Sequence, residues 1–452
     1  RFAGERHLPG RSRIFVGMPR RLLLLIVMVL GACGARGQGW ETLPDAPFTS
    51  RHNDVYFVSP DTGWVVSGAA EIYRTMDGGT SWDLQFSKSA THLRSVGFLD
   101  SRRGFAGNVG TGEFGTTDPN VLYQTDDGGS TWSPVSVFHG QAPLGLCGMN
   151  VVNDSTIVAV GRVRGPSFFV RTTDGGRTWR SKNMSEYAAG LIDVHFTHPD
   201  TGFAVGLTNV DHSKSSGIVL ATSDGGETWE TRFTTSRTGE WCWKLSFPSR
   251  RVGYASLQRN SGSPVNFLKT VDGGFTWEEK LFSTSHYFVQ GIGFVSESEG
   301  WIGGNSDLPP YETRDGGETW TAVNIGSRLN RFRFLGDSLG YAVGRTVHKL
   351  TRPSSVRKAP EDEFPPQLSV ATVYPNPSRG RSMLVYELDR TEVVRIAVYD
   401  ARGGLVEEII HQAQSTGRHE VVWDGSNHAA GVYFWVIRTG DVVRSAPALL
   451  VP

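Results

Sequence analysis

The sequence predicts an all-β fold in two parts, a seven-bladed β-propeller followed by a small β-sandwich of immunoglobulin-like type. A box of the form Asp-Gly-Gly-x-(Thr/Ser)-Trp recurs six times, at intervals of 50, 47, 50, 48 and 43 residues. Glycine supplies 55 and tryptophan 13 of the 452 residues, which suits many tight turns between aromatic-anchored strands. A proline-rich stretch then leads to a last segment of alternating strands. A repeat of this period, with several short strands in each unit, is typical of a propeller.

The first 37 residues have the character of an export signal. Residues 18–21 (Met-Pro-Arg-Arg) precede the apolar run Leu22–Leu30, which is the layout of a secretory signal peptide. We therefore expect residues 1–17 to be upstream readthrough and residues 18–37 to be the signal peptide. The apolar run is shorter than the ~20 residues of a membrane-spanning helix, so we expect no permanent membrane span. Two processing sites stay open, ordinary cleavage after Gly37 and acylation of Cys33 in a lipobox-like segment.

Each predicted unit of the propeller contains about four strands. A glycine followed by an aromatic residue, as in Gly63-Trp64, precedes most boxes, and a strand that ends in an apolar residue such as Phe57 comes before it. These first two elements recur a seventh time, at residues 331–334 and 340–344, with no box after them. Residues 37–41 look like the tail of a box. We therefore predict that this N-terminal strand completes the seventh blade of a propeller over residues 38–352 and closes the ring.

The box itself is a turn sequence. Its carboxylate can accept backbone N–H bonds, its glycines adopt positive φ without strain, and its Trp buries a large ring. Six equivalent carboxylates around a ring do not make one catalytic centre, and one carboxylate per turn is a poor cage for calcium. We therefore assign structural roles to the box residues Asp77 and Trp82, Asp127 and Trp132, Asp174 and Trp179, Asp224 and Trp229, Asp272 and Trp277, and Asp315 and Trp320.

These boxes match the Asp-box, or bacterial neuraminidase repeat. Together with the glycine-aromatic element they resemble the propeller of the photosystem II stability and assembly factor type, over about residues 39–352. The resemblance implies a group that includes assembly factors, glycosidases and exported proteins. Because one fold hosts many activities, it implies little about chemistry.

The C-terminal part is separate. Four prolines in a run of mixed charge predict a linker over residues 353–370. Residues 371–452 then alternate strands with turn signals, which suits a small β-sandwich. The segments 373–377, 395–403, 421–425 and 430–434 resemble the C-terminal sorting domain of the type IX (Por) secretion system. The resemblance implies that residues 371–452 engage the type IX machinery, after signal-peptide export to the periplasm, and that the protein reaches the outer cell surface or the medium. An adhesive immunoglobulin-like domain is the alternative.

Composition excludes several function classes. The 45 basic residues balance 45 acidic residues, so the chain lacks the positive excess of a nucleic-acid binder, and we expect no nucleic-acid partner. Three cysteines are too few for a disulfide framework and lack the spacing of a zinc site. We expect neither a metal nor a cofactor.

Ligands of propellers usually meet the face made by the loops that enter the innermost strands and by the loops between second and third strands. On that face we expect an aromatic and basic group of ligand-binding residues, namely Arg94, Trp241, Trp243, Arg259, His286, Tyr287 and Arg331. We expect an exported, non-catalytic propeller that binds a glycan or protein ligand. The alternative is a glycoside hydrolase, sialidase-like or glucanase-like, that acts on extracellular polysaccharide. Its catalytic residues are not evident, and the Arg-Ile-Pro segment that a sialidase would require is missing.

Overall fold

The computed structural model describes residues 39–352 and 368–451, apart from 389–390, 416 and 440–441. The chain divides into two compact units that separate between Pro353 and Ser354, and each is described by itself. The described residues form β-strands and connecting loops, with no helix among them. The expected readthrough segment, the signal peptide and most of the linker lie outside the described residues.

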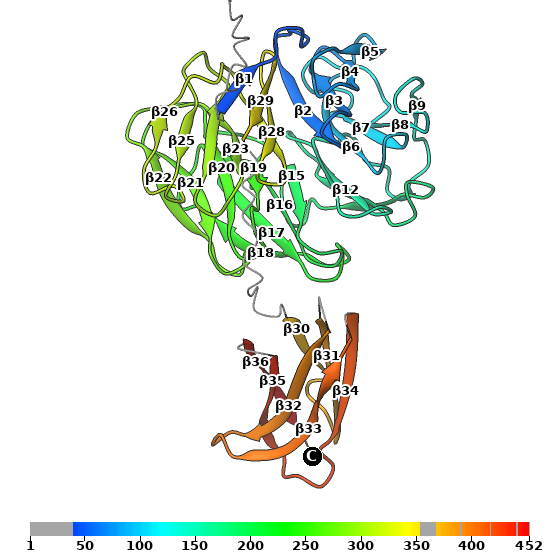
Figure 1. Cartoon of the computed structure of the whole chain (residues 1–452), viewed down its shortest axis with the longest axis vertical. Helices are drawn as coiled ribbons and strands as arrows, with labels where there is room; N and C mark the ends of the chain where they lie inside the picture. The colour runs from blue at the N-terminus through cyan, green and yellow to red at the C-terminus, as the bar shows by residue number, and fades with distance from the viewer. Residues whose placement is uncertain (1–38, 353–367, 389–390, 416, 440–441, 452) are drawn as a thin grey trace, which may run out of the picture. The chain divides into compact units, whose positions relative to one another are not determined.

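The first unit contains seven antiparallel sheets, numbered here 1 to 7 (Figure 1). Sheet 1 comprises β2 (His52–Phe57), β3 (Gly63–Ser67), β4 (Glu71–Thr75) and β5 (Asp83–Ser87). Sheet 2 comprises β6 (Leu93–Phe98), β7 (Gly104–Asn108), β8 (Leu122–Thr125) and β9 (Ser133–Pro134). Sheet 3 comprises β11 (Gly148–Val151), β12 (Ile157–Gly161), β13 (Phe168–Thr172) and β14 (Arg180–Asn183), with an unpredicted fifth strand, β10 (His139–Gly140), parallel to β14.

The remaining sheets repeat this plan. Sheet 4 comprises β15 (Gly190–Phe196), β16 (Gly202–Leu207), β17 (Gly217–Thr222) and β18 (Glu230–Thr234). Sheet 5 comprises β19 (Glu240–Ser246), β20 (Gly253–Arg259), β21 (Val265–Thr270) and β22 (Glu278–Ser283). Sheet 6 comprises β23 (Val289–Phe294), β24 (Gly300–Gly304), β25 (Tyr311–Thr313) and β26 (Thr321–Ala322). Sheet 7 comprises β27 (Arg331–Leu335), β28 (Leu339–Val343), β29 (Val347–Thr351) and β1 (Gly39–Thr42).

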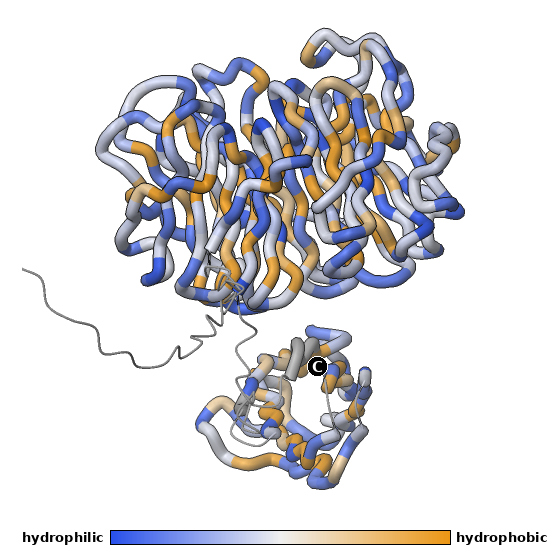
Figure 2. The backbone as a smooth tube through the Cα atoms, turned by 45° about the horizontal axis from the view of Figure 1, so that its top comes forward, coloured by the Kyte–Doolittle hydropathy of each residue, from blue (hydrophilic) through white to orange (hydrophobic). Residues whose placement is uncertain are grey.

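The first strands of the sheets contact one another in sequence order, and β27 of sheet 7 contacts β2 of sheet 1. The seven sheets therefore follow one another around an axis lined by their first strands. Figure 2 shows apolar segments along the strands inside this unit and hydrophilic segments at its loops. The prediction of an all-β propeller is confirmed.

The N-terminal strand completes sheet 7, as the sequence predicts. β1 pairs antiparallel with β29, and Trp40 lies opposite Leu350. The Trp40 ring packs edge-on against Trp301 and Phe334, with centroids 5.3 and 6.4 Å apart. Box tryptophans of other sheets pack in the same way on the phenylalanine that ends the first strand, as Trp82 does on Phe57. Trp40 thus supplies to sheet 7 the ring that a box supplies elsewhere.

Stacked aromatic rings join neighbouring sheets. Tyr341 of sheet 7 stacks on Phe57 of sheet 1 with centroids 3.6 Å apart and planes 5° apart. Trp64 of sheet 1 stacks in the same manner on Phe98 of sheet 2, at 3.5 Å. A Cβ at Gly63 would lie 2.5 Å from the Phe57 ring, which explains the glycine of the glycine-aromatic element.

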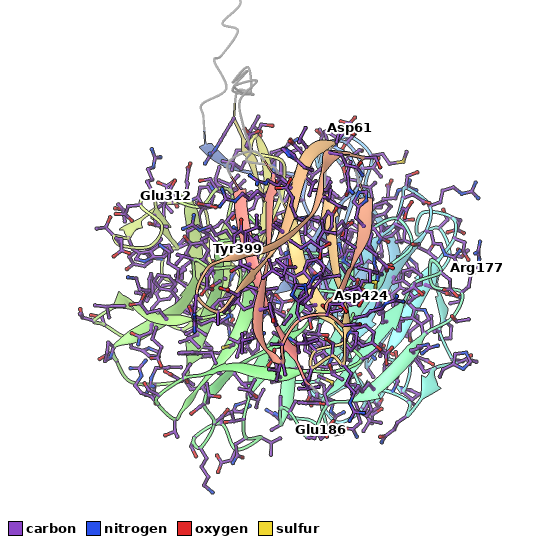
Figure 3. All side chains as sticks on the ribbon, turned by 90° about the horizontal axis from the view of Figure 1, so that it is seen from below. Asp61, Arg177, Glu186, Glu312, Tyr399 and Asp424 are labelled. Carbon is purple, nitrogen blue, oxygen red and sulfur yellow. The ribbon has the colours of Figure 1, made fainter. Side chains whose placement is uncertain are left out.

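The box turns contain a threonine that the sequence reasoning missed. Two residues before each box aspartate, a threonine hydroxyl donates to the aspartate Oδ1 at 2.8 Å and accepts the N–H of the second box glycine. The aspartate also accepts the N–H of the residue four positions on, such as Ser81 at Asp77. Hydrogen bonds from Ser81 lower the pKa of Asp77 to about 2. In Figure 3, Arg177 of the third box projects from the edge of the unit, far from the axis.

The second unit contains two sheets. One comprises β30 (Leu368–Tyr374), β31 (Arg381–Leu388) and β34 (Gly417–Asp424). The other comprises β33 (Leu405–Gln414), β32 (Glu392–Asp400), β35 (Gly431–Thr439) and β36 (Val442–Leu450). Buried side chains of both sheets form one hydrophobic cluster, among them Leu384, Ile396, Trp423 and Trp435.

The role of Trp40 in closing sheet 7 can be tested by substitution. We expect Trp40→Ala to lower the free energy of unfolding by about 2 kcal/mol, because it removes a half-buried aromatic ring from the contact between sheets 6 and 7. Urea denaturation of the full chain measures the change. The matched control is Glu41→Ala, whose side chain is exposed on the same strand. Equal stability of the two variants would contradict the role assigned to Trp40.

Candidate functional site

Charged side chains from distant sheets meet at the axis. Arg331 of β27 donates to both oxygens of Asp193 on β15, from Nη1 at 2.9 Å and Nη2 at 2.8 Å. The Nε of Arg331 lies 3.2 Å from the Oδ1 of Asp54 on β2. Arg333 also donates two hydrogen bonds to Asp54, from Nε to Oδ1 at 3.1 Å and from Nη2 to Oδ2 at 3.0 Å. These contacts, which we call the axial ion cluster, tie sheet 7 to sheets 1 and 4.

The cations of this region exceed its carboxylates. Burial opposes ionisation of Asp193, but the attraction of Arg331 and Lys244 holds the pKa of that carboxyl well below its usual range. Lys244 of β19 only approaches Asp193, with Nζ–Oδ1 at 4.0 Å and no hydrogen bond. Burial and repulsion from Arg331 lower the pKa of Lys244 to about 7. Positive charge at the axis is thus already unfavourable.

Arg94 is a further cation of this region. It lies on β6, is only 1% exposed, and makes no hydrogen bond or ion pair with any described residue. Its Nε and Nη2 are both buried. Burial lowers the pKa of Arg94, and repulsion from Arg331 acts in the same direction. Because Arg331 and Arg333 hold both axial carboxylates, neither of these is left to pair with Arg94.

Two arginines share one indole ring next to the axis. The guanidinium carbons of Arg94 and Arg51 lie 4.9 and 5.8 Å from the centroid of the Trp243 ring. Phe114, in the loop between β7 and β8, lies 5.7 Å from the Arg94 guanidinium and is 48% exposed. The Nε and Nη2 of Arg51 are also buried without a partner. We call Arg51, Arg94, Phe114 and Trp243 the cation–aromatic cluster.

This cluster lies on the loop face, the end of the unit made by the segments that enter the first strands and by the loops between second and third strands. The box turns join third to fourth strands, so in an antiparallel meander they lie at the opposite end. Of the residues predicted to bind a ligand, the structure brings Arg94 and Trp243 together here. Trp241 lies beside them in the same hydrophobic cluster as Trp243, and its ring contacts the His212 ring at 4.2 Å.

The other predicted ligand residues have different surroundings. Arg331 belongs to the axial ion cluster. Arg259 donates to Glu240 Oε2 at 2.9 Å, and its carbonyl oxygen lies 3.3 Å from the exposed His286 ring. Tyr287 packs in the core of sheet 6, where its hydroxyl donates to the carbonyl of Pro309 at 3.1 Å. These four residues do not join Arg94 in one site.

Sequence reasoning missed Arg51 and Phe114 as members of the cluster. Phe114 lies in one of the long loops on the loop face, and it is an aromatic residue between Gly112 and Gly115, both at positive φ. An exposed aromatic residue in a glycine-rich loop was the available signal. No signal in the sequence pointed to Arg51, because its role depends on its contact with the distant residue Trp243.

Two further ionisable groups lie near the cluster. Glu113 Oε1 accepts the N–H of Arg164 at 2.5 Å and lies 3.5 Å from the Nε of Arg162. Burial raises the pKa of Glu113. Burial also raises the pKa of the Cys147 thiol to about 11, so at neutral pH it is a poor nucleophile.

Two kinds of site were sought among the described residues, a metal-ligand group and a membrane-spanning helix. No group of three or more His, Cys, Asp or Glu side chains in the described ranges is arranged to hold a metal ion. Across the same residues, no helix has the length and apolar character needed to cross a membrane. Cys147 and Cys242 are both buried and free.

Two family descriptions match this chain. Residues 34–144 match the photosynthesis system II assembly factor YCF48, and residues 372–446 match the secretion system C-terminal sorting domain. The chloroplastic photosystem II stability/assembly factor HCF136 of Oryza sativa subsp. japonica is 23% identical over 332 residues. That alignment covers 66% of this chain and 66% of the rice protein, just under two thirds of its length. The photosystem II assembly protein Ycf48 of Synechococcus sp. (strain JA-2-3B'a(2-13)) is 23% identical over 74% of this chain and 96% of its own.

Solved structures share the fold of the first unit. YCF48 bound to D1 peptide has a TM-score of 0.53 at 18% identity, and the match covers 70% of this chain and 97% of that one. YCF48 from Cyanidioschyzon merolae has a TM-score of 0.53 at 16% identity, over 69% of this chain and 99% of that one. The class is therefore a β-propeller joined to a secretion-sorting domain. More particularly, the resemblance to the photosystem II assembly factor type and to the Por sorting domain is confirmed.

The unfavourable position of Lys244 predicts a pH dependence. Its pKa is about 7 in the folded chain but about 10.4 when unfolded, so the unfolded state binds more protons between these values. Stability should therefore rise with pH from 7 to 9.5, and Lys244→Met should remove at least about 1 kcal/mol of that rise. Urea denaturation across the pH range measures it. The exposed Lys214→Met is the control, and an unchanged slope in Lys244→Met would contradict the assignment.

Proposed function

We propose that this chain is an exported, non-catalytic, seven-bladed β-propeller that binds a glycan or protein ligand on its loop face. The cation–aromatic cluster is the observation that carries the proposal. Buried guanidinium groups without partners are costly, and a ligand that supplies acceptors offsets that cost. The similar fold of YCF48, which has been solved with a D1 peptide, supports a ligand-binding role for such a propeller.

A ligand site on this face would use residues that converge. We assign Arg94, Trp243 and Trp241 to it, together with Arg51 and Phe114. Arg259 and His286 would form an outer part of the same face, whereas Arg331 and Tyr287 would support it from within. The box residues would act only as turn-forming groups, since their carboxylates are engaged by the turn's own donors.

A glycoside hydrolase is the second candidate, and the raised pKa of Glu113 favours it. A carboxyl group whose pKa is raised is better suited to act as a general acid. Hydrolysis needs a second, ionised carboxylate about 5 to 9.5 Å away. Glu240 is engaged by Arg237 and Arg259 at 2.9 Å each, which makes it a poor partner. The ion pairs of Glu240 therefore favour a binding function over hydrolysis.

Export would proceed in two stages. Residues 18–37 would act as the signal peptide, and residues 371–452 would address the propeller to the type IX machinery through a linker at 353–370. The match of residues 372–446 to a sorting domain supports the second stage. The protein would then reside on the outer cell surface or in the medium.

The binding function predicts a specific pattern on arrays. The full chain should bind a subset of a combined glycan and peptide array without releasing products, because binding rather than catalysis is assigned to the loop face. Trp243→Ala should weaken that binding at least about tenfold, since it removes the ring on which both arginines lie. The control is Phe275→Ala, an exposed residue of a box turn. Product release from a bound glycan, abolished by Glu113→Gln, would support the hydrolase instead.

The sorting function predicts separable parts. Residues 371–452 fused to a reporter with a signal peptide should reach the surface or medium of a type IX-competent host, as measured by cell fractionation. The native protein truncated after residue 352 should stay in the periplasm. Secretion of the truncated protein at the normal level would contradict the sorting role and favour an adhesive domain.

A further inference from the structure

We propose that the cation–aromatic cluster binds the C-terminal carboxylate of a peptide. This inference rests on the proposed function, and it narrows the ligand of the loop face to one chemical group. Nothing in the sequence motifs indicates it, because it follows from how charge is divided among residues that the fold brings together.

A guanidinium buried like that of Arg94 is strongly destabilising unless an anion lies beside it. Asp54 and Asp193 cannot serve, because Arg331 and Arg333 already occupy their oxygens. Repulsion between Arg51 and Arg94 destabilises the cluster further, because both guanidinium groups lie over the Trp243 ring. Glu113 attracts Arg94 without forming an ion pair with it, since its Oε1 contacts Arg162 and accepts the N–H of Arg164. Arg94 therefore lacks a paired anion, which a ligand can supply.

The buried unpartnered atoms of Arg51, Arg94, Trp241 and Trp243 are all donors, from guanidinium or indole N–H groups. A carboxylate offers only acceptors, and its two oxygens suit the fork of a guanidinium. Two unpartnered acceptors are also buried, the Oδ1 of Asn53 on β2 and the Oε2 of Glu113. They suit backbone N–H groups, which a peptide presents close to its terminal carboxylate.

The cluster suits a peptide better than an acidic sugar. Sugars bind proteins largely by stacking on open aromatic faces, but here the indole rings are already covered. Arg51 and Arg94 lie over Trp243, and His212 lies against Trp241. Phe114 is the exposed ring of the cluster, and it contacts the Arg94 guanidinium. The site therefore offers hydrogen-bond donors to an extended ligand group that carries acceptors, and the Phe114 ring forms one side of the site.

The site also differs from the hollows elsewhere on the surface. One of about 420 Å³ lies on β32, β35 and β36 of the second unit, and one of about 260 Å³ lies at the fifth box turn. Neither contains an unpartnered buried cation. We expect a ligand terminus that enters beside the exposed Phe114 ring.

The test uses the full chain and random-sequence decapeptides fixed through their N-termini, either with free C-terminal carboxylates or with C-terminal amides. We expect binding to the carboxylate pool, and at least about 30-fold weaker binding to the amide pool. Arg94→Gln should reduce binding to the carboxylate pool by a similar factor. The matched control is Arg177→Gln, an exposed arginine in a box turn, which should leave the affinity unchanged.

A second readout separates binding from folding. Arg94→Gln should raise the melting temperature of the unliganded protein, because it removes a buried charge that has no partner. A lower melting temperature with unchanged peptide affinity would overturn the inference and make Arg94 a structural residue. Equal binding to both pools would overturn the carboxylate inference while leaving the proposed binding function intact. Absence of peptide binding, with Trp243-dependent binding of a glucuronate-ended oligosaccharide, would overturn it in favour of an acidic glycan.

Discussion

Arg331 reaches across the axis from sheet 7 to Asp193 of sheet 4, and it approaches Asp54 of sheet 1 with its remaining nitrogen. A buried charge that loses its partner costs several kcal/mol, so these contacts have to form together. They can do so only when the ring is closed, because sheet 7 carries both Arg331 and Arg333. Closure in turn depends on β1, which gives sheet 7 its outer strand and the Trp40 ring. The two ends of the propeller sequence are therefore coupled through the axis.

The same ion pairs determine where a ligand can act. By engaging both axial carboxylates, Arg331 and Arg333 leave the neighbouring cations Lys244 and Arg94 without full partners. Lys244 can respond by losing its proton near neutral pH, but arginine cannot. The uncompensated charge therefore remains at Arg94, on the loop face. The opposite end carries box turns whose aspartates are already saturated by local donors. The box turns that stabilise the propeller and the residues assigned to ligand binding thus lie at opposite ends of the same strands.

The sequence predicts those features that depend on short-range pattern. The box turns, the glycine next to the Phe57 ring and the strand at Trp40 all follow from residues within one repeat. The threonine before each aspartate was equally regular, and self-comparison could have found it. By contrast, Asp193, the hydrogen-bond partner of Arg331, is 138 residues away, and no local pattern indicates it. Tyr287 was predicted to bind a ligand on the loop face, whereas it is buried against Phe282 of sheet 5 and Tyr311 of sheet 6. Arg94 was identified by position, but its lack of a partner depends on the whole ring.

The axial arginines differ in their partners, since Arg331 is ion-paired with Asp193 and Asp54 inside the protein, whereas Arg94 has no ion pair and is assigned to a ligand. Nuclear magnetic resonance of the arginine Nε–H groups tests this directly, with Arg331→Lys and Arg94→Lys used to assign the two signals. On addition of a binding peptide with a free carboxylate, the account predicts a shifted and more slowly exchanging Arg94 signal and an unchanged Arg331 signal. An Arg94 signal that is already protected and does not respond, or a shift confined to Arg331, would contradict it.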